Sequence, residues 1–339
     1  MKRLYTMSKF PGLFISITVS LLIVLTAGCK KDEEAESSES MIGILNFVLP
    51  EYMLSGTQYN LIGEGITFPV TGINYKWSTT GFAPDSATGL SATVITPLEI
   101  GEYTVTLSAQ MDGYYSKSIS RTTTIIKPSS PESFSGVVYG NDFITDPRDG
   151  KHYYFSEIGD LFWFSSNLNW EGSGRPYKNI SALSHIYGRL YSWQEATATT
   201  GDNGICPPGW RVPTNQDWEN LAKYLNGGVS LPFDDPWRGL GSKITVEAKL
   251  NGANMWKYSP NNNKENLFHW NALPAGNATG TLSSFINLNN YGIWWSSTQA
   301  DANNALYRYI YFDSSDFSYN IANKTYFGAS VRCVREVNQ

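Results

Sequence analysis

Short runs of alternating apolar and polar residues dominate the chain from about residue 42 to residue 127. The alternation is clearest over 75–78 and 102–108, where every second side chain is aromatic or aliphatic. A period of two is typical of strands that bury one face. We therefore expect six strands, over 44–49, 66–70, 75–78, 92–95, 102–108 and 118–126. Because Gly and Pro separate these short runs, the pattern predicts an all-β sandwich.

The pattern changes after 128–135, a Pro- and Ser-rich segment that is typical of a linker. From 136 to 337, short aromatic segments are separated by turns rich in Asn and Gly. Apolar residues at helical spacing predict a helix over 215–225, with Thr214 as its N-cap and Asp217 completing an approximate capping box. Further elements are expected as a helix over 192–198 and strands over 294–297, 305–313 and 331–335. This predicts an α+β domain after the sandwich.

The first 28 residues have the features of a targeting segment and are excluded from the fold. A basic start is followed by an apolar stretch over 13–25, which is too short to span a bilayer as a helix. The segment 25–29, Leu-Thr-Ala-Gly-Cys, resembles the lipobox of bacterial lipoproteins, which makes Cys29 the expected site of lipidation. The alternative is an ordinary secretory signal with an incidental cysteine. After cleavage, residues 29–41 would form an acidic, Ser-rich tether.

The residues after Cys29 bear on localisation. Residues 30–34, Lys-Lys-Asp-Glu-Glu, resemble the charged sorting segment of lipoproteins that reach the outer cell surface in Bacteroidota. They also fit a simple solvated tether. Since no Asp follows Cys29 directly, the usual inner-membrane retention signal is absent. We expect a lipid-anchored outer-membrane protein that is exposed at the cell surface.

The amino-acid composition limits which partners, cofactors and covalent bonds we expect. The chain has 339 residues, of which 41% are hydrophobic and only 16% charged, with a net charge of −5. This excludes charge-driven disorder and argues against a nucleic-acid partner. In an exported protein, Cys206 and Cys333 are expected to form a disulfide, the alternative being two free buried thiols. No cofactor or metal is expected, although the segments 301–304 and 313–316 offer calcium-type oxygen ligands that turn formation explains more simply.

Tryptophan is concentrated in the C-terminal domain, where ten of the eleven lie between residues 163 and 295. Trp170, Trp237, Trp256 and Trp270 occur in polar loops rich in Asn and Gly. Exposed rings there could stack on sugars or form protein-binding hot spots, so we treat these four as candidate ligand-binding residues. The alternative is that they fill the core of a loop-rich domain.

Several segments, taken in order, carry a resemblance to a known family. They are 146–153 (DPRDGKHY), 158–163 (IGDLFW), 187–193 (YGRLYSW), 206–214 (CPPGWRVPT), 271–276 (NALPAG), 294–298 (WWSST) and 330–334 (SVRCV). This set resembles the Fibrobacter succinogenes major paralogous domain family, which implies a C-type lectin-like fold over 136–337. In the first domain, Tyr-x-Trp at 75–77 and the segment 101–107 resemble PKD-like and immunoglobulin-like sandwiches.

The segment from Arg211 to Trp218, with Pro213 and Thr214 between them, also resembles formylglycine-generating enzymes of the same fold. The active cysteine pair of those enzymes has no counterpart here, and the Glu-Pro-Asn or Gln-Pro-Asp motif of sugar-binding C-type lectins is absent. The resemblance therefore implies the fold and neither activity. We interpret these four residues as structural, with Arg211 in a buried ion pair, the alternative being that Arg211 clamps an anion.

No order of Ser, His and Asp residues indicates a catalytic triad, and no catalytic residue is assigned. The expected function is that of a non-catalytic binding or adhesion module for a glycan or a surface protein, held at the membrane by its lipid anchor. One alternative is a polysaccharide-active enzyme with carboxylates dispersed in the sequence. Another is a structural subunit of a surface assembly such as a filament tip.

Overall fold

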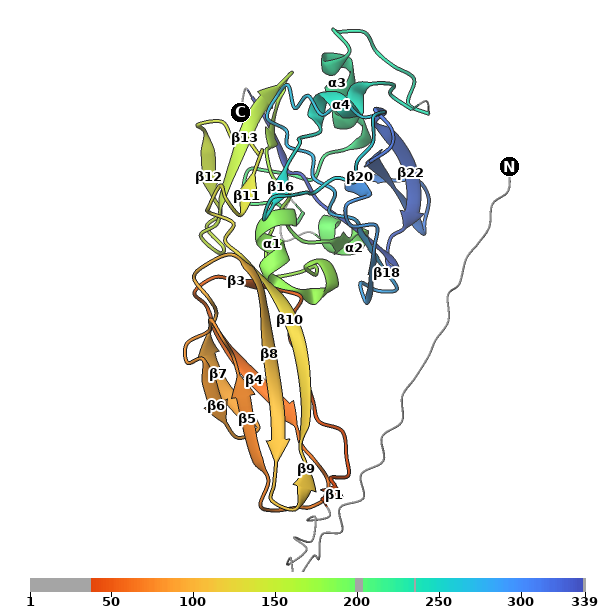
Figure 1. The fold of residues 1–339 in the computed structure, drawn as a ribbon. Helices are drawn as coiled ribbons and strands as arrows, with labels where there is room; N and C mark the ends of the chain where they lie inside the picture. The colour runs from red at the N-terminus through yellow and green to blue at the C-terminus, as the bar shows by residue number, and fades with distance from the viewer. Residues whose placement is uncertain (1–37, 199–203, 235, 338–339) are drawn as a thin grey trace, which may run out of the picture. The chain divides into compact units, whose positions relative to one another are not determined.

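The computed structural model describes residues 38–198, 204–234 and 236–337. Cys29, the expected signal peptide 1–28 and most of the tether 29–41 lie outside these residues. From Glu39 onward the described residues form one compact unit that is rich in β-strands (Figure 1). Within the described residues, no helix is long and apolar enough to cross a membrane.

Two sheets in the first part of the chain, drawn in orange to yellow in Figure 1, share one hydrophobic core and form the N-terminal sandwich. The larger sheet contains, in spatial order, β3 (Tyr52–Leu54), β10 (Lys117–Ile126), β8 (Gly101–Gln110), β5 (Asn74–Ser78) and β6 (Ser86–Thr88). The smaller contains β2 (Asn46–Phe47), β4 (Gln58–Glu64) and β7 (Ser91–Ile95), and a separate short pair joins β1 (Glu39–Ser40) to β9 (Tyr114–Tyr115). Trp77 of β5 is fully buried between the sheets and packs against Phe47.

Four of the six expected strands of the sandwich are confirmed, as β5, β7, β8 and β10. The run expected over 44–49 shortens to β2. The strand expected over 66–70 is wrong, because the strand of this region is β4 and only Phe68 makes an isolated bridge, to Ile42. The error has a physical origin: Leu61 of β4 points into the core, whereas Phe68 and Val70 face solvent.

The C-terminal part, coloured green to blue in Figure 1, combines short sheets with short helices. The first sheet contains β12 (Phe143–Thr145), β13 (His152–Ile158), β14 (Leu161–Phe164) and β24 (Val334–Glu336), and the second contains β15 (Tyr191–Ser192), β23 (Phe327–Ala329), β18 (Asn277–Thr279) and β19 (Ser284–Ile286). The third contains β20 (Tyr291–Gln299), β21 (Asn304–Tyr311) and β22 (Ser318–Asn323), and the fourth contains β11 (Phe134–Ser135), β16 (Lys249–Leu250) and β17 (Ala253–Asn254). The helices are η1 (Tyr177–Asn179), α1 (Ser181–Tyr187), α2 (Trp193–Thr197), α3 (Asn215–Leu225) and α4 (Leu240–Ile244).

The helix expected over 215–225 is confirmed with those bounds as α3, and the one expected over 192–198 is α2. Both helices begin with a complete capping box, from Thr214 in α3 and from Ser192 in α2. The three expected strands correspond to β20, β21 and the shorter β24. Because β11 already pairs with β16, the first strand of this part begins inside the segment expected to be a linker.

A buried arginine organises the loop-rich interior of the C-terminal part. The guanidinium group of Arg332 is fully buried and lies over the ring of Trp270. It donates hydrogen bonds to the Asn167 side chain at 2.8 Å and to the backbone carbonyls of Phe164, Trp270 and Asn271. Burial lowers the pKa of Arg332 to about 9. These acceptors lie at the end of β14, in the loop that follows it and at residues 270–271, so one buried side chain joins segments that are far apart in the sequence and satisfies their polar groups.

Candidate functional site

The expected disulfide is confirmed, because Cys206 and Cys333 are bonded to each other. The alternative of two free thiols is therefore wrong. Next to the bond, Arg211 and Val334 exchange two backbone hydrogen bonds of 2.9 Å. Closing a loop of 127 residues constrains the unfolded chain by about 5 kcal/mol in the chain-entropy model. The bond thus joins the segment before α3 to the residue that directly precedes the last strand, β24.

Arg211 lies between two carboxylates. Its guanidinium donates to Asp217 at 2.5 Å and 3.1 Å and to Glu336 at 2.6 Å, which raises the pKa of Arg211 above its ordinary value. Asp217 also accepts from the backbone N–H of Thr214 at 2.6 Å, which completes the cap of α3. Both terminal nitrogens of Arg211 are thus occupied by the protein itself.

Trp218 and Pro213 complete this structural motif. The ring of Trp218 is fully buried and packs against Trp163 with a centroid separation of 4.7 Å. The carbonyl of Pro213 accepts a hydrogen bond of 2.8 Å from the backbone N–H of Ser297 in β20. The motif therefore fixes where α3 begins and how it lies on the core.

Three carboxylates of this domain make contacts within the protein itself. In the capping box of α2, Glu195 accepts from the backbone N–H of Ser192 at 2.8 Å and from that of Gly174 at 3.1 Å. Burial raises the pKa of Glu195, but these hydrogen bonds outweigh burial and hold the pKa below its usual value. Asp217 and Glu336 are held by one arginine. All three carboxylates are therefore engaged by hydrogen bonds or ion pairs within the protein.

Three of the four candidate tryptophans do not face solvent. Trp237, Trp256 and Trp270 are 1%, 2% and 0% exposed, and all three belong to one hydrophobic cluster. Their loops are polar in sequence, but the rings point inward and pack with both aliphatic and aromatic side chains of this core, because burying a large ring removes much apolar area from water. The expectation that these three rings stack on a ligand is corrected, because they offer no face to one.

Trp170 is half-buried, and its neighbours cover much of the ring. The guanidinium of Arg148 lies over it at 4.4 Å from the centroid. The backbone of Gly172 lies so close that a Cβ there would come within 2.2 Å of the ring. Arg148 itself forms an ion pair of 2.7 Å with the fully buried Asp146. Trp170 thus supports the turn between β12 and β13.

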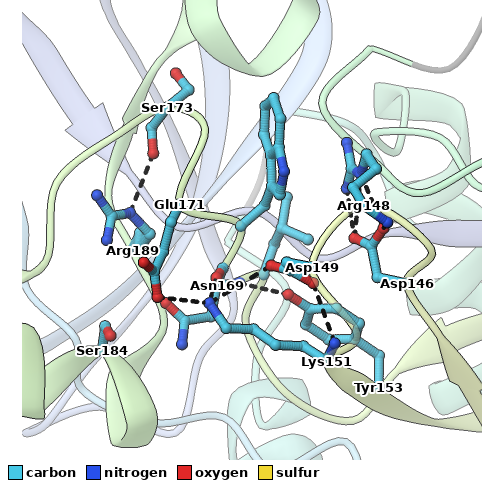
Figure 2. Close-up of polar contacts among 12 residues, drawn as sticks. Asp146, Arg148, Asp149, Lys151, Tyr153, Asn169, Glu171, Ser173, Ser184 and Arg189 are labelled. Atoms are coloured by element: carbon cyan, nitrogen blue, oxygen red, sulfur yellow. Dashed lines mark hydrogen bonds and ion pairs between the residues drawn. The ribbon is translucent and has the colours of Figure 1, made fainter.

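The polar cluster next to this turn is internally paired (Figure 2). The ammonium of Lys151 donates to the carbonyl of Asn169 at 2.6 Å and to the carboxylate of Glu171 at 2.9 Å. The hydroxyl of Tyr153 accepts from the backbone N–H of Asn169 at 3.1 Å, and Arg189 donates to the carbonyl of Ser173. Hydrogen bonding to Lys151 lowers the pKa of Glu171. This arrangement stabilises the loop around Trp170 and leaves little free charge for a ligand.

The two oxygen-rich segments form turns. Asp301 accepts from the backbone N–H groups of Asn303 and Asn304. Asp313 accepts from Ser259 and from Asn261. In the part of the chain that the structure describes, no group of three or more His, Cys, Asp or Glu residues is placed to hold a metal ion.

A different feature has the form of a ligand site. A groove of about 360 Å³ lies beside the sheet of β20, β21 and β22. We call it the tyrosine groove, and it is lined by Asn277, Thr279, Ile286, Asn287, Tyr291, Ile293, Tyr307, Tyr309, Asn320 and Phe327.

The floor of the tyrosine groove follows from the alternation of β21. Tyr307 and Tyr309 are half-buried and face the groove, whereas the intervening Arg308 and the following Ile310 are buried on the other face. The register with β20 places Ile293 directly opposite Tyr309. Because side chains two residues apart share a face of a strand, the two tyrosines lie side by side.

One wall of the tyrosine groove is formed by segments that lie far from β21 in the sequence or pair in another sheet. Asn277 and Thr279 belong to β18, and Asn287 follows β19. The Asn287 side chain donates to that of Asn277 at 2.8 Å, which fixes both amides. Phe327 of β23 stacks on Tyr307, with centroids 5.1 Å apart and planes inclined by 21°.

The side chains that line the tyrosine groove are uncharged. None of its described lining residues carries a charged side chain. Burial raises the pKa of Tyr307 to about 12 and also raises that of Tyr291, so both hydroxyls are protonated at neutral pH. Among the described residues, the hydroxyls of Tyr291, Tyr307 and Tyr309 have no hydrogen-bond partner. The groove therefore offers ring faces together with free neutral donors and acceptors.

Comparison with known families agrees with the sequence pattern. The model of the Fibrobacter succinogenes major domain matches residues 157–335, which is more than half of the chain. The chain belongs to this family. No curated protein matches the chain. The tyrosine groove lies within the part matched by the Fibrobacter succinogenes major domain, whereas the N-terminal sandwich lies outside it.

Sequence reasoning missed the groove. The tyrosines at 307, 309 and 311 alternate within the strand expected over 305–313, so the sequence pattern already places their side chains on one face of that strand. The asparagines of the wall gave no such signal, because Asn is common in turns throughout this domain. Only the pairing of β18 with β23 brings them to the same place as the tyrosines.

Proposed function

We propose that this protein is a lipid-anchored surface protein that binds its ligand without catalysis, and that its C-terminal domain binds a neutral carbohydrate in the tyrosine groove. The observation that carries this proposal is the groove itself, in which aromatic rings and free neutral polar groups occur together without a charge.

The proposed location rests on the lipobox at 25–29, with Cys29 as the lipidated residue and the outer membrane as the destination. The disulfide between Cys206 and Cys333 supports export, since such bonds persist in oxidising compartments. We also infer the finer fold classes from the sequence resemblances, namely a PKD-like or immunoglobulin-like sandwich and a C-type lectin-like domain. All of these remain part of the proposal.

The ligand class follows from what the groove can satisfy. A sugar ring presents apolar C–H faces and a rim of hydroxyls that both donate and accept. The rings of Tyr307 and Tyr309 match the apolar faces, and the Asn amides and tyrosine hydroxyls match the rim. An ionic ligand would be desolvated there without a countercharge, which is unfavourable. Neutral sugars are therefore favoured over acidic ones.

The test uses the mature chain with Cys29→Ser, so that the protein is free of lipid, on an array of neutral and acidic glycans. We expect binding to neutral glycans, followed by calorimetry with the best of them. Tyr309→Ala should weaken binding about 30-fold, as for a hot-spot residue worth about 2 kcal/mol. Tyr309→Phe keeps the ring and should lose only about fivefold, as for one hydrogen bond.

The matched control is Tyr258→Ala, because Tyr258 is 79% exposed and lies outside the groove. The proposal is refuted if no neutral glycan binds, or if Tyr309→Ala binds as well as the control. Cleavage of a glycan during the assay would instead favour the polysaccharide-active enzyme. Ordered oligomers without glycan binding would favour a structural subunit of a surface assembly.

A further inference from the structure

The outer face of the β2–β4 pair carries a set of large apolar side chains that the residues described by the structure do not cover. We call it the apolar ladder, and it consists of Ile42, Ile44, Val48, Ile62, Phe68 and Val70. Their exposed fractions run from 49% for Phe68 to 83% for Val70. Exposed apolar side chains that gather on one face of a sheet often mark an interaction site.

The pairing register explains why these residues form one surface. Ile42 bridges to Phe68, and Asn46 pairs with Glu64 in the antiparallel sheet. Continuing the same register places Val48 opposite Ile62. Opposed residues of an antiparallel pair share one face of the sheet, so these rungs point the same way. One rung is polar, because the Asn46 amide donates to the Glu64 carboxylate at 3.3 Å.

Two cations of β10 border the ladder. The ammonium of Lys117 donates to the carbonyl of Gly43 at 2.9 Å, and the guanidinium of Arg121 donates to the carbonyl of Phe47 at 2.5 Å. Arg121 also donates to the Asn46 side chain at 2.7 Å. Aliphatic side chains flanked by Lys and Arg are typical of surfaces that lie in the headgroup region of a bilayer.

The position of the ladder in the chain identifies its occupant. Ile42 follows Cys29 by 13 residues, which can span at most about 45 Å when fully extended. A lipid on Cys29 would therefore keep the ladder close to the bilayer at a high effective concentration. This step rests on the proposed lipid anchor.

We propose that the apolar ladder docks on the bilayer that holds the anchor, with its aliphatic side chains in the headgroup boundary and with Lys117 and Arg121 facing anionic headgroups. The sandwich then lies on the membrane surface instead of moving freely at the end of its tether.

The experiment places a fluorophore on the ladder. Once Cys29 is acylated and Cys206 is bonded to Cys333, Ile44→Cys provides a single free thiol for an environment-sensitive label. The lipidated protein is reconstituted in vesicles of phosphatidylethanolamine and phosphatidylglycerol. We expect a blue shift and strong quenching by brominated acyl chains at this position. The matched control is Leu98→Cys, an equally exposed aliphatic position of the sandwich at 73% exposure that lies outside the ladder, and it should show neither effect.

A second measurement separates docking from anchoring. The chain with Cys29→Ser should still bind these vesicles weakly in flotation, and Ile44→Ser with Val70→Ser should weaken this binding at least about tenfold. Equal quenching at the two labelled positions overturns the docking proposal while leaving the anchor intact. Absence of an acyl group on Cys29 overturns the anchor, and flotation of the lipid-free chain then decides the docking. A concentration-dependent dimer that Ile44→Ser abolishes would assign the ladder to a second copy and also overturn the proposal.

Discussion

The Arg211 network makes a prediction that can be worked from the structure. Asp217→Ala removes the carboxylate that accepts two hydrogen bonds from Arg211 and one from the backbone N–H of Thr214. Removing one partner of a buried ion pair costs about 3–5 kcal/mol. Arg211 keeps Glu336 and remains about one-third exposed, which favours the lower end of that range. The lost reciprocal hydrogen bond of the capping box, from the Thr214 backbone N–H to the Asp217 carboxylate, adds about 1 kcal/mol. We therefore expect Asp217→Ala to lower the free energy of unfolding by about 3–4 kcal/mol.

The assay is urea unfolding followed by tryptophan fluorescence, which reports on the C-terminal domain because ten of the eleven tryptophans lie there. The midpoint should fall while the m-value stays unchanged. Asp160→Ala is the matched control, since Asp160 is an exposed carboxylate near the same site, and it should change stability by less than about 0.5 kcal/mol. A double-mutant cycle with Arg211→Ala should show strong coupling. A loss below about 1 kcal/mol for Asp217→Ala, or additive single effects, would refute the reasoning.

Three further predictions concern other parts of the fold. Replacing Cys206 and Cys333 by Ala should lower the unfolding free energy by up to about 5 kcal/mol in the same titration, and an unchanged midpoint would contradict the entropic role of the bond. The pKa of Glu195 is lowered in the folded state, so its stabilising effect is present above the unfolded pKa of about 4.5 and is lost as the pH falls through the folded value. The stability difference between the wild type and Glu195→Gln should therefore shrink on acidification below pH 4.5, and a constant difference would argue against this effect. Gly188→Ala should lower the free energy of unfolding by about 2–4 kcal/mol, because φ is +72° and a Cβ would come within 2.7 Å of a neighbouring side chain. Gly150 also has a positive φ but lies in open space, so Gly150→Ala should lower it by only about 1 kcal/mol. Equal losses in these two variants would show that steric contact is not the cause.

Much of the local structure could be predicted because local sequence decides it. The helix α3 begins and ends at the expected residues, since Thr214 and Asp217 satisfy its first N–H groups and four apolar residues share one face. The long strands β8 and β10 follow from strict alternation. The run at 66–70 misled the prediction because an exposed apolar stretch has the same pattern as a buried one. The tertiary structure exposes this run, because Phe68 pairs with Ile42 and both side chains lie on the outer face of the sheet.

The candidate site could not be predicted in the same way. Trp237, Trp256 and Trp270 share a polar sequence context with exposed loops, and only packing shows that they fill the core. The tyrosine groove joins residues between 277 and 327 through the register of two different sheets. Sequence spacing carries no information about such a register when the strands are short and their partners lie far along the chain.

The sequence by itself determined the disulfide pair, the capped helices, most of the alternating strands and the family. Each of these depends on neighbouring residues, on residue type or on an ordered set of motifs, so a linear pattern is sufficient to specify it. Only the tertiary structure decided which aromatic side chains are buried, which line a groove, and where the described residues leave the apolar ladder uncovered. Those outcomes depend on how distant segments share a limited core volume, because a side chain is buried only when another segment covers it.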